Sequence, residues 1–137
     1  MASAIYPFAK SLFLNATIDM FNDVIEAILV DDSYVYSTAH DCITTIRNYQ
    51  VGSPCVLTVT SIANGVFDAN DATFTAVTTD TVPLQKVSGV VIYKYKNDSD
   101  LQSTPIVYID CSSTPITPNG SNITVQWDNG PNKIFAL

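Results

Sequence analysis

The sequence is poor in the residues that carry chemistry. Only six Lys or Arg stand against thirteen Asp or Glu, and His40 is the single histidine. A net charge of −7 argues against direct nucleic-acid binding, which needs clustered basic residues to neutralise phosphates. The three cysteines lack CxxC spacing, which argues against a disulfide framework or a zinc site. We therefore expect free, buried thiols at Cys42, Cys55 and Cys111, and no cofactor.

Long apolar runs are also missing. No window approaches 18 uninterrupted apolar residues, so we expect no membrane-spanning helix. The opening segment MASAIYPFAK has no basic stretch ahead of a continuous apolar core, so a secretory signal is not expected. Without export, the sequons at Asn15, Asn97, Asn119 and Asn122 are a by-product of a chain with 27 Ser or Thr residues.

What the chain does contain favours β structure. It holds twelve Asp but one Glu, Glu26, and Asp is typical of turns and caps whereas Glu is typical of helix interiors. Thr and Val dominate the middle of the chain, which favours strands. Because 47% of the residues are hydrophobic and 14% are charged, a core of useful size is expected. We predict one β-rich domain over residues 1–137.

The predicted fold is an antiparallel sandwich or barrel with a short N-terminal helix. Apolar residues on one face after Pro7 predict a helix over residues 6–16. Residues 24–30 favour a buried strand, with a continued helix as the alternative. Thr38 and Asp41 resemble a capping box ahead of a short helix to Ile46, and a plain loop is the alternative. Alternation between turn signals predicts further strands over residues 55–62, 66–67, 72–77, 87–95, 106–109, 123–127 and 133–137.

The last fifteen residues read ITVQWDNGPNKIFAL. Alternating Ile, Val and Trp precede the turn residues DNGPN, and a second apolar run follows. The pattern predicts a closing hairpin in which Trp127 and Phe135 are core residues.

Three groups of side chains could carry chemistry, and each has a simpler structural interpretation. His40 could form a dyad with Cys55 or Cys111, in which the cysteine is the nucleophile, but a lone histidine is more often a packing or capping residue. The segment Asp68-Ala-Asn-Asp71 could bind calcium, or form an Asx turn between strands. Lysines alternate with tyrosines over residues 93–96, which suggests either a nucleic-acid platform or one solvated strand face. The simpler interpretation is favoured throughout, so we expect no enzyme.

Several segments together resemble a family of small structural proteins of tailed bacteriophages and prophages. The matching stretches are YPFAKSLFL, ID, AILVDDSYVYSTAHD, GVFDANDATFTAV, VIYK, PIVYID and ITPNGSNITVQWDNGPNKIF, the last being the most distinctive. They run from about Ile5 to Leu137, and residues 42–61 follow the pattern less closely. The resemblance implies a virion component, made in the bacterial host cytoplasm, and brings no catalytic residue.

Within that family, two roles are open. The first is a non-enzymatic decoration (cement) protein that stabilises the outer head shell, binding the major capsid protein or other virion proteins as a homo-oligomer. The alternative is a tail or baseplate component that binds a host-surface glycan or another tail protein. Candidate partner contacts are Tyr6, Phe8, Tyr34 and Tyr36, because the first 36 residues are rich in aromatics outside the predicted strands. The alternative for these four is packing on the chain's own sheet.

Overall fold

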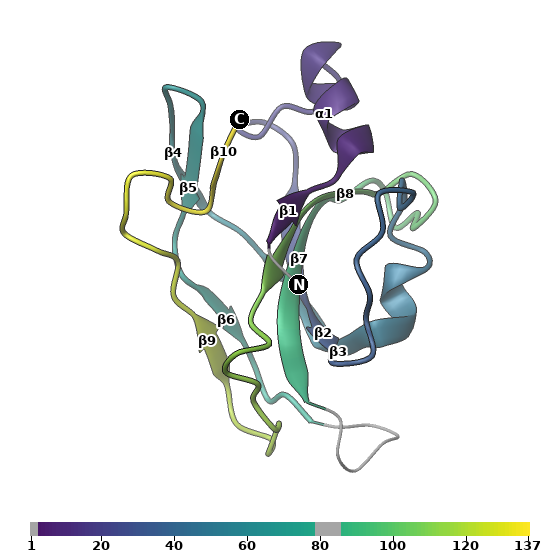
Figure 1. Cartoon of the computed structure of the whole chain (residues 1–137), viewed down its shortest axis with the longest axis vertical. Helices are drawn as coiled ribbons and strands as arrows, with labels where there is room; N and C mark the ends of the chain where they lie inside the picture. Colours follow the sequence, from purple (N-terminus) through teal and green to yellow (C-terminus); the bar gives the residue numbers. More distant parts are fainter. Residues whose placement is uncertain (1–2, 79–85) are drawn as a thin grey trace.

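The computed structural model describes residues 3–78 and 86–137, which form antiparallel sheets with one short α-helix (Figure 1). The predicted mainly β class is therefore confirmed. The largest sheet has the strand order β1-β8-β7-β2-β3, and each neighbouring pair is antiparallel. Its strands are β1 (Ala4–Ile5), β2 (Ile25–Asp31), β3 (Gln50–Val56), β7 (Val87–Lys94) and β8 (Thr104–Asp110).

Two smaller sheets lie on one side of this main sheet (Figure 1). One has the order β10-β5-β4, and the other pairs β6 with β9. Their strands are β4 (Val59–Ala63), β5 (Val66–Ala69), β6 (Ala72–Phe74), β9 (Ile123–Val125) and β10 (Phe135–Ala136). On the other side of the main sheet runs the segment between β2 and β3, which ends in the 3-10 helix η1 (Ile46–Tyr49). The main sheet is thus covered on both faces.

The two central strands, β2 and β7, are almost fully buried because both faces of the main sheet are covered. Seven of the eight residues of β7 are buried, and so are six of the seven residues of β2. A strand covered on both faces needs apolar side chains at every position rather than at alternate ones. This explains the continuous runs AILV and VVIY, which belong to a single connected core.

The N-terminal helix α1 (Pro7–Leu14) confirms the predicted helix and ends two residues earlier than expected. Pro7 occupies the first turn, where its missing N–H costs nothing. Ala16 then adopts a positive φ of 61°, and the amide of Thr17 bonds back to the Leu12 carbonyl. This left-handed turn stops the helix and directs the chain back towards β2.

The structure divides one predicted strand and decides one open alternative. The alternating run 55–62 is divided between β3 and β4, which belong to different sheets. The break falls at Leu57, a buried residue whose amide bonds to the Ile25 carbonyl at 2.8 Å. Between the two alternatives for residues 38–46, the structure supports the loop, since residues 38–45 contain turns and bends without a helix and η1 begins at Ile46. It is Ser37 that accepts the local amide bond, from Ala39.

The closing hairpin is a second correction. β9 pairs with β6, and β10 pairs with β5, so the two C-terminal strands are not partners. Periodicity identifies a strand but not its neighbour. Trp127 and Phe135 are nevertheless buried, as predicted. The Trp127 indole N–H donates to the Asn70 carbonyl at 2.9 Å, which ties the C-terminal segment to the loop between β5 and β6.

Glycine at position 89 is required by a close approach in the main sheet. A Cβ there would lie 2.5 Å from Cε1 and 2.9 Å from Oη of Tyr108 on the neighbouring strand β8. The ring therefore occupies the space that a side chain on residue 89 would need. Both contacts are with a ring packed among other aromatics, so relief by a small side-chain movement is restricted.

We predict that Gly89→Ala lowers the free energy of unfolding by about 1–3 kcal/mol through overpacking against Tyr108. Urea unfolding of the purified chain measures this. Combining Gly89→Ala with Tyr108→Leu removes the ring, so the double variant should lose less than the sum of the two single changes. Strict additivity would contradict the assignment of the effect to this contact.

Candidate functional site

An aromatic cluster lies between the main sheet and the segment after β2. Tyr6 packs against Tyr36 with ring centroids 4.9 Å apart, and Tyr34 meets the edge of Tyr108 at 5.3 Å. The His40 ring lies 5.7 Å from that of Tyr34. Offset and edge-to-face pairs of this kind stabilise a core beyond simple burial.

A hydrogen-bond chain runs through this aromatic cluster. The hydroxyls of Tyr6 and Tyr34 are 2.6 Å apart, and that of Tyr34 is 2.9 Å from Nδ1 of His40. Burial and the bond to Tyr34 raise the pKa of Tyr6, and burial raises the pKa of Tyr34 to about 12. Both tyrosines are therefore protonated donors near neutral pH. A chain from Tyr6 through Tyr34 to His40 requires an unprotonated Nδ1 as its final acceptor.

Of the four predicted partner contacts, two are buried and two are exposed or half-buried. Tyr6 is 0% exposed and Tyr34 is also buried, so for these two the structure favours packing on the chain's own sheet. Their hydroxyls satisfy one another, which permits burial of two phenols. Phe8 is 42% exposed and Tyr36 is half-buried, with its hydroxyl donating to the Ile5 carbonyl. Phe8 and Tyr36 thus remain within reach of a partner.

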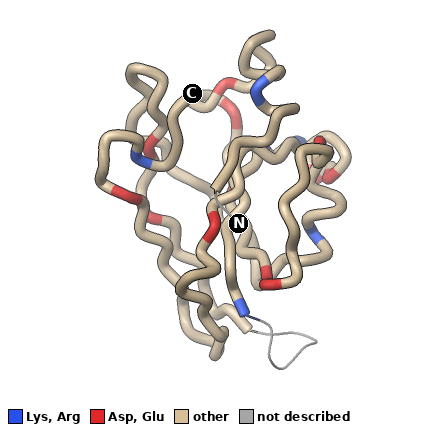
Figure 2. Tube along the Cα trace, viewed as in Figure 1, with Lys and Arg blue, Asp and Glu red and all other residues tan. Residues whose placement is uncertain are grey.

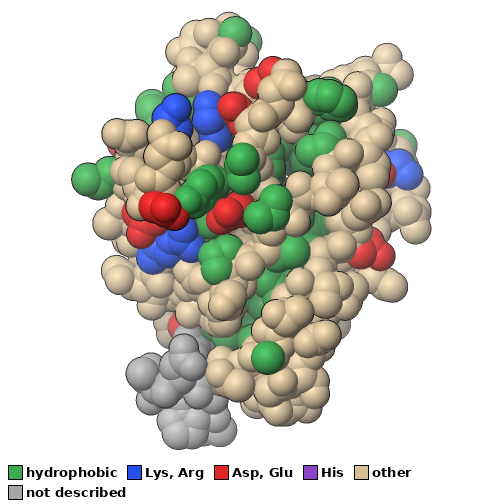
Figure 3. Space-filling model, turned by 180° about the vertical axis from the view of Figure 1, so that it is seen from behind, with side chains coloured by type: hydrophobic (Ala, Val, Ile, Leu, Met, Phe, Trp, Pro, Cys, Tyr) green, Lys and Arg blue, Asp and Glu red, His purple; other side chains and the backbone are tan. Residues whose placement is uncertain are grey.

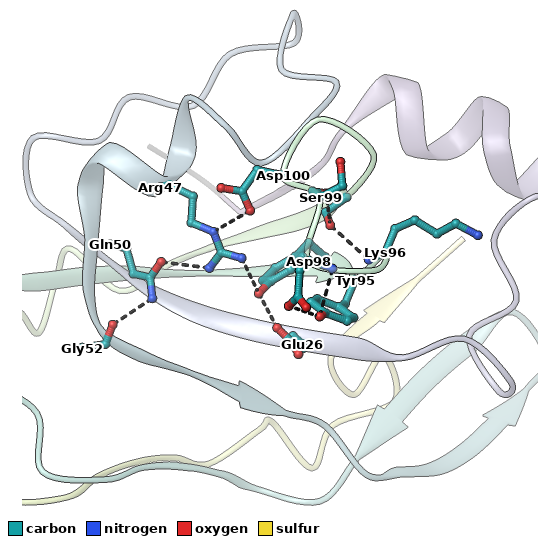
Figure 4. A network of polar contacts seen from close by, with 11 residues as sticks. Glu26, Arg47, Gln50, Gly52, Tyr95, Lys96, Asp98, Ser99 and Asp100 are labelled. Carbon is teal, nitrogen blue, oxygen red and sulfur yellow. Dashed lines mark hydrogen bonds and ion pairs between the residues drawn. The ribbon is translucent and has the colours of Figure 1, made fainter.

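A second polar network was not predicted from the sequence, and Arg47 is its centre (Figure 4). The guanidinium of Arg47 donates to Asp100 at 3.1 Å, to Gln50 at 2.9 Å and to the Tyr93 hydroxyl at 3.1 Å. The same hydroxyl donates to Glu26, the one glutamate of the chain, at 2.5 Å. One side chain of η1 therefore fastens the loop after β7 and the face of the main sheet together.

The residues considered for catalysis or metal binding have local structural partners. Nδ1 of His40 bonds to Tyr34 rather than to a cysteine, and all three cysteines are free and half-buried rather than fully buried. Burial raises the thiol pKa of Cys55 and of Cys111, which lowers their thiolate fractions. Within residues 3–78 and 86–137, no group of three or more His, Cys, Asp or Glu is placed to hold a metal ion.

The acidic segment of residues 68–71 and Lys94 of the segment 93–96 also form contacts within the chain. The Asp68 carboxylate accepts the amide of Ala69, and the Asp71 carboxylate accepts the amide of Trp127. Neither contact is the i to i+2 bond of the Asx turn that was the alternative to calcium, because one joins adjacent residues and the other joins residues far apart in the chain. Lys94 forms an ion pair with Asp23 at 3.0 Å and donates to the Thr17 carbonyl at 2.7 Å, while Lys96 is exposed.

An apolar groove lies at the end of the molecule where α1 stops. Its volume is about 390 Å³, and apolar side chains from four segments line it, chiefly Phe13, Met20, Ile62, Phe67 and Phe135. A neighbouring hollow of about 330 Å³ shares Phe13 and Leu137 with it. The groove thus lies between the helix, the tip of the β4–β5 hairpin and the C-terminal strand.

Leu14 and Leu137 line the two hollows and reach solvent, and Phe21, which follows the groove residue Met20 in the chain, is exposed as well. Leu14 is 90% exposed, Phe21 73% and Leu137 64%. We call the groove together with Leu14, Phe21, Ile62 and Leu137 the apolar end. Apolar groups also break through the polar surface on the face seen in Figure 3. Large apolar side chains exposed beside an apolar groove are typical of protein interaction sites, because a monomer gains no stability by leaving them in water.

The local chain chemistry holds Phe21 outward. The Asp19 carboxylate accepts the amides of Phe21 and Asn22 at 3.0 and 3.1 Å, and the Asp23 carboxylate accepts the amide of Asp19 at 2.7 Å. Hydrogen bonds from Asn22 and Phe21 lower the pKa of Asp19. The turn is thus pre-organised, and presenting Phe21 costs little further ordering on binding.

Sequence reasoning missed the apolar end, although two signals were present. Leu14 lies within the predicted helix but off its apolar face, and it is the last residue of α1. Phe21 stands inside a turn rich in Asp and Asn, where a large apolar residue has no local reason to be. Each is an apolar residue in a polar context, which is more informative than an apolar residue in a strand.

Because His40 is partly buried and bonded to Tyr34, we expect the free energy of unfolding to depend on pH. Burial lowers the pKa of His40 in the folded chain below its ordinary value of 6.5, with Asp41 opposing. The unfolded chain then binds more protons below pH 6.5, so the free energy of unfolding should fall as the pH drops from about 7 to about 5. Urea unfolding at a series of pH values measures this. His40→Asn, which keeps a neutral acceptor, should flatten the slope, and equal slopes in both proteins would refute the assignment.

The Arg47 network gives a stability prediction. Arg47→Met leaves Asp100, Gln50 and Tyr93 without their shared donor, and should lower the free energy of unfolding by about 1–3 kcal/mol. The matched control is Lys96→Met, because this lysine is exposed and its side chain extends away from the network (Figure 4). Urea unfolding of both variants should separate them, whereas an equal loss would show that the removed charge alone matters.

The described residues thus contain an aromatic core, an arginine-centred network and the apolar end, and of these three the apolar end exposes its large side chains to solvent. No helix among residues 3–78 and 86–137 combines the length and apolar character needed to cross a membrane. No protein-family model, curated protein or solved structure matches the chain.

Proposed function

We propose that this chain is a non-enzymatic structural protein of a tailed-phage virion, and that it decorates and stabilises the outer head shell. The observation that carries the proposal is the apolar end, an uncovered surface built for contact with protein. The resemblance of the segments from YPFAKSLFL to ITPNGSNITVQWDNGPNKIF supports a virion as the place where such contacts are made.

The packing of the rest of the chain supports a role in which the protein binds a shell and stabilises it without catalysing a reaction. The central strands are buried on both faces, and the segment between β2 and β3 is fastened by the Arg47 network. A well-packed body transmits strain with little internal movement. A chain of this kind stabilises a shell by binding the assembled form and not the dissociated one, which shifts the equilibrium by mass action.

The net charge of the chain is compatible with a subunit that stays free in solution and binds to the head after the shell has assembled. At −7, free copies repel one another weakly and stay soluble before they are incorporated. Partner chemistry then has to come from apolar and polar contacts rather than from attraction to an acidic or nucleic-acid surface. The major capsid protein is the proposed partner, and a tail or baseplate position, with a host glycan or another tail protein as ligand, is the competing placement.

Deletion of the gene from the phage that encodes it should leave head assembly intact and lower the heat resistance of full heads. The reason is that a bound decoration protein adds its binding free energy to the shell alone. Cryo-electron microscopy of wild-type and deleted virions should show the chain in many copies on the head. Survival after heating, with plasmid-supplied chain as the control, measures the stabilisation.

A few copies at the tail would replace the head assignment by the tail alternative. Absence of the chain from purified virions would overturn the proposal altogether. Heads of equal heat resistance with and without the chain would remove the stabilising role.

A further inference from the structure

We propose that a slot between the strands β1 and β10 takes an extended segment of a partner protein as an added β-strand. β1 is an edge of the main sheet, and β10 is an edge of the sheet β10-β5-β4. Two hollows of about 540 and 330 Å³, which we call the slot, are each lined by residues of both edges. The inference deepens the proposed function, and rests on it only for the source of the segment, a protein of the head shell.

The lining residues show that the two edges run in the same direction. The larger hollow is lined by residues 3–5 and 134–135, and the smaller one by Ile5 and residues 136–137. Both edges thus pass from the larger hollow to the smaller one, towards the end of the molecule that holds α1 and the C-terminus (Figure 1). A segment between them can therefore run antiparallel to both, as β8 and β5 already do on their far sides.

Backbone groups of β1 point away from its own sheet. Tyr6 donates its amide to the Ile106 carbonyl at 2.9 Å, so this pair is hydrogen-bonded. Bonded and non-bonded pairs alternate in an antiparallel ladder, so the preceding pair, Ile5 with Val107, is non-bonded. The amide and carbonyl of Ile5 are therefore directed away from β8. The carbonyl accepts the Tyr36 hydroxyl at 3.2 Å, and the amide has no acceptor in the described part of the chain.

The same argument applies to β10. The Leu137 amide donates to the Gly65 carbonyl at 2.8 Å, so this pair is hydrogen-bonded. Ala136, which pairs with Val66, is then in a non-bonded position, and its amide and carbonyl are directed away from β5. Two edges with outward backbone groups therefore border the slot. An extended chain supplies amides and carbonyls at the spacing that such edges need, which is the basis of strand addition.

A second copy of this chain has no described strand that fits the slot. An inserted strand needs both of its edges free, because β1 lies on one side of it and β10 on the other. Every strand that the structure describes is already paired on at least one side. An exchange between copies would have to break one of these pairings, whereas an extended, unpaired segment of another protein breaks none. We therefore assign the occupant to a different protein.

The lining also indicates the chemistry of the segment. Among the described residues, Lys10 is the one charged side chain that lines either hollow, and it lines both. The elements α1, β1 and β10 hold no acidic residue, although the chain as a whole carries −7 (Figure 2). No hydrogen bond or ion pair within the described chain engages the Lys10 ammonium. The slot thus offers an unpaired cation to whatever enters it.

These features together specify the occupant. One Asp or Glu on the segment would pair with Lys10, while the net charge of the chain repels a segment that carries several. Phe13, Leu14 and Ala136 line the smaller hollow and favour apolar side chains. A strand presents alternate residues to opposite faces, so we expect apolar residues at alternate positions and a single acidic residue between them.

The first experiment adds two blocked pentapeptides to the purified full chain, Thr-Val-Asp-Val-Thr and its counterpart with Lys in place of Asp. NMR titration should shift the amides of Ile5 and Ala136, and the Asp peptide should bind about threefold to tenfold more tightly. Lys10→Glu should reverse the order of the two peptides. Lys96→Glu is the matched control, because this exposed lysine lines neither hollow, and the order should stay unchanged.

A proline variant tests the backbone contacts separately from the charge. Ala136→Pro removes an amide that makes no bond to β5, a change that edge strands tolerate. It should weaken both peptides, whereas Ala136→Ser, which keeps the amide, should not. Circular dichroism of each variant confirms that the fold is retained.

The second experiment tests the source of the segment. Purified chain is added to heads of the gene-deleted phage, and hydrogen exchange is followed in the free and the head-bound chain. The amides of Ile5 and Ala136 should exchange rapidly in the free chain and about tenfold or more slowly on heads. Lys10→Glu should bind heads more weakly than Lys96→Glu does.

Amides of Ile5 and Ala136 that do not respond to either peptide would overturn the inference, and so would an unchanged peptide order in Lys10→Glu. Protection of these amides that rises with the concentration of the free chain would give the slot to a second copy and overturn it as well. Heads that bind the chain without protecting these amides would refute the added strand and keep the proposed function. Heads that bind no chain, with the peptide results upheld, would do the reverse.

Discussion

Burial of the central strands on both faces is the constraint on which the rest of the structure depends. β2 and β7 pair along seven residues of register, and nearly all of their side chains are removed from water. Such strands have no stable existence without covers, because burial of apolar area supplies the driving force of folding. The small sheets cover one face and the segment that ends in η1 covers the other, so each cover contributes to the stability of the whole chain.

The cover made by the segment after β2 is mostly irregular backbone, and polar and aromatic contacts hold it in place. Arg47 fixes its far end to Tyr93, while Tyr34 and His40 fix its middle to Tyr6. Gly89 contributes by leaving room for the Tyr108 ring beneath this segment. A loop can serve as one layer of a core when its own polar groups are satisfied, which these hydroxyls and the guanidinium achieve.

Sequence patterns identified the strands better than their partners. The runs at β2 and β7 are long and β-branched, and turn signals bound them, so local chemistry was sufficient. The prediction of a C-terminal hairpin was wrong because Asp128 to Asn132 has turn chemistry yet connects two sheets. Pairing with the distant strands β5 and β6 places β9 and β10 in different sheets. Tyr6 and Tyr34 were named as candidate partner contacts because they lie outside the predicted strands, with packing on the chain's own sheet as the alternative. The structure favours that alternative, because burial follows from tertiary cover and not from local class.

The apolar end could not be found by periodicity because its members come from separate parts of the chain. Local chemistry explains how each is presented: the turn at Ala16 ends the helix after Leu14, and the Asp19 turn projects Phe21. Neither arrangement is required by the core, since both side chains contribute almost nothing to it. Ordered turns that hold apolar side chains in solvent lower the solubility of a chain unless a partner covers those side chains.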